Sequence, residues 1–137
     1  SNDKFTYAGF DLAKSPIAYC EHNYAKKGAQ FYLSGIPSKI ADYSVMSGTF
    51  NYAPDLTVRV WKEYLFKSLN SIWNLTRHSM IFNLLISEEE KITSQSISYI
   101  RKETIVNFCQ RNFGETQEYF SSKLPREITF CVHKTKL

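Results

Sequence analysis

The sequence predicts an α/β fold: a mostly parallel sheet, covered by helices as a three-layer structure, with an antiparallel last strand. Strand-like segments alternate with segments of helical period along the 137 residues. Residues 80–86 are apolar except for Asn83, which is typical of a parallel strand buried on both faces. The two strands predicted last are joined by a short polar connection containing Pro125, which favours an antiparallel pair.

The first predicted strand covers residues 5–11 (FTYAGFD), which are rich in aromatic residues and end on an acid. Ser15 and Pro16 follow, and they suit the N-cap and the first turn of a helix. Gly28 is expected to end that helix, because glycine readily adopts the left-handed conformation found after helix ends.

Two short strands are predicted next, over residues 30–33 and 42–47. Gly35 stops the first of them and Gly48 closes the second. A long helix is expected over residues 57–77, with an apolar stripe that we interpret as core packing. The stripe consists of Trp61, Leu65, Leu69, Ile72 and Trp73.

The C-terminal part is expected to begin with a polar loop over residues 87–98, in which the three glutamates at 88–90 form a solvated face. A second amphipathic helix is predicted over residues 102–113. The last two strands are expected at residues 116–120 and 127–133. No internal repeat is evident, so we expect a single domain over residues 1–137.

Composition narrows the class of protein. The 10 Phe, 9 Tyr and 2 Trp residues supply a sizeable core, and 5 Gly with 4 Pro exclude collagen and low-complexity chains. The formal charge of +4 is scattered along the sequence, so a nucleic-acid partner is not expected. No apolar run is long enough to span a bilayer and no signal peptide is visible, so we expect a cytoplasmic protein with no membrane partner.

Motifs for metal or phosphate binding are missing from the sequence. Cys20, Cys109 and Cys131 are odd in number and far apart, which predicts reduced thiols rather than disulfides or a zinc site. No two glycines lie close enough for a Gly-x-Gly phosphate loop, and the three histidines stand alone. An acid at a strand end, Asp11, is the best candidate ligand, because a carboxylate can accept two hydrogen bonds from a ribose diol.

Several segments resemble class I S-adenosylmethionine-dependent methyltransferases. Residues 7–16 (YAGFDLAKSP) are similar to the second strand and following helix of that family. Residues 42–51 (DYSVMSGTFN) resemble the fourth strand and the Ser-Gly-x-Phe-Asn turn of one branch. Residues 80–85 and 127–134 are similar to the fifth and the last strands. The resemblance implies S-adenosylmethionine as the cofactor and transfer of its methyl group to an acceptor that the sequence does not disclose.

The resemblance also implies roles for single residues. Asp11 would hold the ribose hydroxyls and Leu12 would pack against the adenine. The segment after the third family strand would contact the adenine, without the acid that the family often has there, and the turn after the fourth would line the pocket beside the methionine part. These two segments are Ser34, Gly35 and Ile36, and Ser47, Gly48, Thr49 and Phe50. Asn51 would steady the turn or face substrate, Asn83 is expected to be a satisfied structural amide, and no catalytic base is singled out.

The family's first strand and its acid-x-Gly-x-Gly loop have no counterpart in this sequence, so we expect an N-terminally incomplete domain. Three remedies for the missing central strand are open: direct pairing of its two neighbours, a strand from a second copy, or a strand from outside this sequence. We therefore expect aggregation or a homo-oligomer through unpaired sheet edges. The alternatives to a methyltransferase are a non-catalytic remnant serving as a subunit or interaction module, and a single-strand nucleic-acid binder; enzymatic activity of this chain alone is uncertain.

Overall fold

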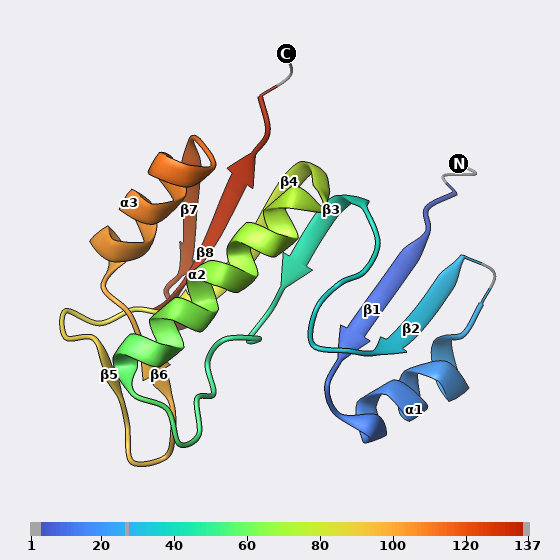
Figure 1. Cartoon of the computed structure of the whole chain (residues 1–137), viewed down its shortest axis with the longest axis horizontal. Coiled ribbons are helices and arrows are strands. Elements are labelled where there is room, and N and C mark those ends of the chain that lie inside the picture. Colours follow the sequence, from blue (N-terminus) through green and yellow to red (C-terminus); the bar gives the residue numbers. More distant parts are fainter. Residues whose placement is uncertain (1–3, 27, 136–137) are drawn as a thin grey trace. The chain divides into compact units, whose positions relative to one another are not determined.

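The computed structural model describes residues 4–26 and 28–135, which form two compact units, up to Lys39 and from Ile40 onward. Each unit has its own sheet. Figure 1 shows the helices and strands of both. An α/β fold is confirmed, and all three predicted helices are present.

The first unit consists of β1 (Tyr7–Asp11), α1 (Lys14–Tyr24) and β2 (Ala29–Leu33). The two strands pair in parallel, and α1 connects them. The prediction that Ser15 caps α1 is wrong. Ala13 occupies the N-cap position, and its N–H donates to the Asp11 side chain at 2.8 Å. The helix therefore begins two residues earlier than predicted. Pro16 then lies in the first turn, where no N–H is needed. The helix also ends before Gly28, which lies in the following turn with φ +96°.

The second unit begins with β3 (Ala41–Met46), α2 (Val58–Asn74) and β4 (Thr76–Leu85). It continues through the two-residue strands β5 (Lys91–Ile92) and β6 (Ser98–Tyr99) to α3 (Lys102–Asn112). It closes with β7 (Thr116–Ser121) and β8 (Leu124–His133). The large sheet has the order β3-β4-β8-β7: β3 and β4 are parallel, and β8 is antiparallel to both β4 and β7, which confirms the antiparallel last strand.

Three predicted boundaries were wrong in the second unit. The long helix ends before residue 77, because Thr76 already starts β4; its hydroxyl donates to Ile72 O at 2.7 Å and lies 2.6 Å from the Ser44 hydroxyl of β3. The polar loop contains the small antiparallel pair β5–β6. β8 begins before residue 127 and includes Pro125, which an exposed outer part of a strand tolerates.

Both helices of the second unit cover the same face of its sheet (Figure 1). Met80, Phe82 and Leu84 of β4 are buried there with the stripe of α2, and α3 adds Ile105 and Cys109 to the same core. The core interpretation of the α2 stripe is thereby confirmed, except that Trp73 is only partly buried. The opposite face, marked by Ile81 and Asn83, carries no helix of this unit.

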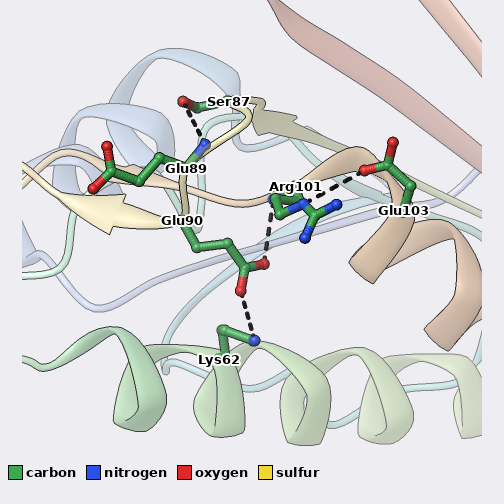
Figure 2. A network of polar contacts seen from close by, with 6 residues as sticks. All are labelled: Lys62, Ser87, Glu89, Glu90, Arg101 and Glu103. Atoms are coloured by element: carbon green, nitrogen blue, oxygen red, sulfur yellow. Dashed lines mark hydrogen bonds and ion pairs between the residues drawn. The ribbon is translucent and has the colours of Figure 1, made fainter.

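The expectation that residues 88–90 form a solvated face was wrong for Glu90. Figure 2 shows its side chain between α2 and the segment before α3: Lys62 Nζ lies 2.8 Å from one carboxylate oxygen and the Arg101 N–H donates to the other at 3.2 Å. Burial by itself raises the pKa of Glu90, but the hydrogen bonds from Lys62, Arg101 and Thr104 outweigh it and lower the pKa below 4.5. Glu90 therefore holds the loop containing β5 and β6 against α2.

Candidate functional site

One group of the predicted site residues lies at the carboxyl edge of β1 and β2 in the first unit. Because the strands are parallel, Asp11 and Leu33 are paired at their ends, and the Ser34 N–H donates to Asp11 O at 2.9 Å. Asp11 is exposed; its Oδ1 accepts from the Ala13 N–H, and its other carboxylate oxygen accepts no hydrogen bond within residues 4–26 and 28–39. One carboxylate oxygen is thus fixed and the other is free for a ligand.

The loop after β2 brings its residues next to Leu12. A Cβ at Gly35 would lie 3.0 Å from Leu12 Cδ2, so glycine allows this close approach. Ser34 shapes the loop, since its hydroxyl donates to Ile36 O at 2.9 Å and accepts from the Ile36 N–H at 3.3 Å. Leu12 and Ile36 are 74% and 59% exposed, so two apolar side chains face solvent beside a carboxylate. All five site residues predicted in this unit are therefore brought together.

The other predicted site residues form the turn that follows β3 in the second unit. Gly48 has φ +68°, a conformation that glycine adopts without strain, and Asn51 N–H donates to Gly48 O at 3.4 Å. Ser47, Gly48 and Thr49 are exposed. Phe50 differs: its ring is 2% exposed and lies in the core, and its carbonyl accepts from Trp61 Nε1 at 3.0 Å and from Ser98 Oγ at 2.7 Å. Phe50 thus anchors the turn while the three residues before it face outward.

Asn83 joins this turn to the sheet. Its Oδ1 accepts from the Gly48 N–H at 2.6 Å, and its Nδ2 donates to Ser47 Oγ at 3.3 Å and to Glu127 Oε1 at 2.6 Å. The expectation that Asn83 is a satisfied amide is confirmed. Glu127 was not singled out in the sequence; its only local signal is a charge at the start of the alternating pattern of β8.

A polar cluster at the other end of the same sheet consists of Ser79, His133, Cys131 and Gln117. The Ser79 hydroxyl lies 2.6 Å from His133 Nδ1, and His133 Nε2 lies 3.2 Å from Gln117 Oε1. Burial raises the pKa of the Cys131 thiol, so this residue is not an activated nucleophile. Burial likewise raises the pKa of Cys109 to about 12. All three cysteines are free thiols, and we interpret the cluster as structural.

Hollows in the surface do not coincide with the predicted cofactor residues. One of about 440 Å³ lies between α1 and β2, with Glu21, Phe31 and Tyr32 in its wall. Another of about 230 Å³ lies at the end of the β7–β8 hairpin. Within the described ranges, no helix is both long and apolar enough to cross a membrane.

Comparisons with known proteins place the fold. No protein-family model matches the chain, and no curated protein matches it either. Magnesium protoporphyrin IX methyltransferase from Synechocystis PCC 6803 with bound SAH is similar in structure, with a TM-score of 0.66, 9% sequence identity, and coverage of 95% of this chain and 64% of that chain. The DhpI–SAH complex is similar with a TM-score of 0.63 and 9% sequence identity, and the match covers 96% of this chain and 67% of that chain. A protein of Bordetella parapertussis, described as a possible exported protein, is similar with a TM-score of 0.70 and 7% sequence identity. That match covers 96% of this chain and 54% of that chain.

These likenesses show a class I methyltransferase-like fold. The chain spans less than two thirds of the length of the Synechocystis and Bordetella proteins.

Proposed function

We propose that this chain supplies part of an S-adenosylmethionine site and belongs to an enzyme that transfers the cofactor's methyl group to an unknown acceptor. The observation that carries the proposal is the free oxygen of Asp11 beside two exposed apolar side chains at the carboxyl edge of β1 and β2. Ligands of open α/β sheets bind at that edge. The fold of two structures with bound SAH supports the same assignment.

The residues of the first unit suit the nucleoside part of the cofactor. Asp11 would accept hydrogen bonds from the ribose hydroxyls through its free oxygen, and it is held for this by the Ala13 N–H. Leu12 and Ile36 would cover the adenine, with Ser34 and Gly35 shaping the loop between them.

The residues of the second unit suit the methionine part. Ser47, Gly48 and Thr49 would line the pocket there, and Phe50 would fix the turn through the core. The sulfonium cofactor supplies an activated methyl group when bound. The protein's task would then be to align the acceptor with the methyl group of the cofactor and to exclude water.

The proposal includes the domain and its edges. We propose one Rossmann-like methyltransferase domain over residues 1–137. Within the described ranges β1 pairs only with β2 and β3 only with β4, so each strand has one edge of free backbone groups. Such edges support pairing with a strand from outside this sequence or with a second copy. If cofactor binding fails, these edges favour the alternative of a non-catalytic subunit.

The test is calorimetric titration of the full chain with S-adenosylhomocysteine. Asp11→Asn keeps an oxygen for the Ala13 N–H and replaces the free acceptor by a donor, so we expect affinity to fall about tenfold or more. Asp55→Asn is the matched control, because Asp55 is exposed and asparagine tolerates its φ of 59°. No binding by the unaltered chain would refute the proposal; equal binding by Asp11→Asn would remove Asp11 from it.

A further inference from the structure

The smaller hollow lies on the helix-free face of the second unit's sheet. It measures about 230 Å³, and its wall consists of Tyr119, Phe120, Ser121, Leu124, Glu127 and Thr129. β7 runs parallel to β4, because both are antiparallel to β8. The β7–β8 hairpin therefore lies at the carboxyl edge of this sheet, the same edge as the turn after β3.

The wall of the hollow is mainly apolar and exposed. Phe120 is 79% exposed, Tyr119 55% and Leu124 54%. Covering the exposed Tyr119 ring in this concave surface with an apolar group of a ligand would be favourable. The volume is below that of sites for drug-sized ligands, so it suits one ring with a short arm, or one end of a longer molecule.

Glu127 gives the hollow its charge. Its Oε1 accepts from Asn83 Nδ2 at 2.6 Å, and within residues 40–135 no donor reaches its Oε2. Arg126 is its neighbour in β8 and so points to the opposite face of the strand, and no described cation forms an ion pair with Glu127.

Tyr119 pairs with Thr129 and lies on the same face as Glu127. Phe120, in contrast, pairs with Ile128 and so points to the helix-covered face. The hollow thus combines a half-buried carboxylate with one aromatic ring, a combination that attracts an ammonium group through both charge and cation–π attraction.

We infer that this hollow binds a small amine with an aromatic or other apolar ring, whose ammonium group faces Glu127 Oε2 while its ring packs against Tyr119. Asn83 contacts both Glu127 and the Ser47–Gly48 turn, so the hollow is one side chain away from the proposed methionine pocket. The inference rests on the proposed function in one respect: it makes such an amine the methyl acceptor, after its ammonium group has given a proton to Glu127 Oε2 and freed the nitrogen lone pair.

The binding test needs no cofactor. The full chain is titrated with 2-phenylethylammonium, with neutral 2-phenylethanol and with anionic 3-phenylpropionate while backbone amide resonances are followed by NMR. We expect the ammonium probe to shift the resonances of Phe120 and Thr129, the alcohol to bind at least tenfold more weakly, and the anion not to bind. Equal binding of the three probes, or shifts confined to other residues, would overturn the inference.

Glu127→Gln is the decisive variant. Glutamine can still accept from Asn83, but it presents an amide in place of the free oxygen, so affinity for the ammonium probe should fall at least tenfold. Glu115→Gln makes the same chemical change at an exposed residue outside the hollow and should leave affinity unchanged. Tyr119→Ser is the second variant. It should fold because the Tyr119 ring is exposed, and it should lower the affinity for the ammonium probe as well.

The two proposals fail separately. Binding of the ammonium probe without any binding of S-adenosylhomocysteine would overturn the proposed function alone. Binding of S-adenosylhomocysteine with no response of the hollow, or with full probe affinity in Glu127→Gln, would overturn this inference alone.

Discussion

Replacing Asn83 by alanine tests whether one side chain holds the turn after β3 in place. The substitution removes three hydrogen bonds: from the Gly48 N–H at 2.6 Å, to Ser47 Oγ at 3.3 Å and to Glu127 Oε1 at 2.6 Å. It leaves the core of α2, β4 and β8 in place, because Asn83 lies on the opposite face from Phe82 and Leu84.

The loss of unfolding free energy in Asn83→Ala can be worked out from the hydrogen-bond partners of Asn83. The bond to the Glu127 carboxylate has a charged acceptor and is worth about 1.5–3 kcal/mol, while a neutral bond is worth about 1 kcal/mol. Gly48 is exposed and Glu127 half-buried, so water replaces part of what is lost. We expect Asn83→Ala to lower the free energy of unfolding of the second unit by about 2 kcal/mol, close to a 30-fold change in the unfolding equilibrium.

Urea denaturation followed by tryptophan fluorescence measures this unit alone, since both tryptophans of the chain, Trp61 and Trp73, lie in α2. The slope of the unfolding curve should stay constant while its midpoint falls. Asn107→Ala is the matched control, because the Asn107 side chain is exposed on α3 and makes no hydrogen bond to any described residue; its effect should stay within about 0.5 kcal/mol. If Asn83→Ala shifts the midpoint no more than Asn107→Ala, the three bonds do not stabilise the turn and the reasoning is wrong.

The remaining predictions concern Glu90 and the sheet edges. Glu90→Gln should destabilise the second unit by about 1–2 kcal/mol at neutral pH, because the pair with Lys62 is mostly shielded from water. Since the folded-state pKa of Glu90 lies below its ordinary value, its contribution is complete above that ordinary value and is lost as the pH falls through the lower folded value. The difference between the urea midpoints of the two proteins should therefore be smaller at pH 3 than at pH 7, and an unchanged difference would contradict this. Light scattering should show dimers or larger species of the chain alone, formed through the open edges of β1 and β3, and a clean monomer that binds S-adenosylhomocysteine tightly would refute that expectation.

Local sequence signals located most elements. The stripe of α2 repeats at helical spacing over several turns, so its burial could be predicted without knowing what packs against it. Thr57 caps this helix with a hydroxyl that accepts from the Val60 N–H at 3.2 Å, the interaction expected of such a residue. The first helix was located less well, because Ala13 has no side-chain signal and its start depends on Asp11.

The candidate site could be predicted only in pieces. The predicted site residues of the first unit lie at the ends of adjacent parallel strands, and this neighbourhood follows from the fold class. In the second unit, Asn83 and Glu127 are 44 residues apart, and the hydrogen bond between them depends on the register of β4 with β8. A shift of one residue would turn the Glu127 side chain to the other face, so no local pattern could have identified the pair.

The sequence by itself determined where the three helices and the longer strands lie, because those choices depend on the spacing of apolar residues and on residues at the element ends. The tertiary structure decided that Glu90 is paired rather than solvated, that Phe50 belongs to the core, and that Glu127 borders a hollow. Each of these depends on the neighbour that folding brings to a side chain from a distant part of the chain, and that neighbour sets its burial, hydrogen bonding and charge.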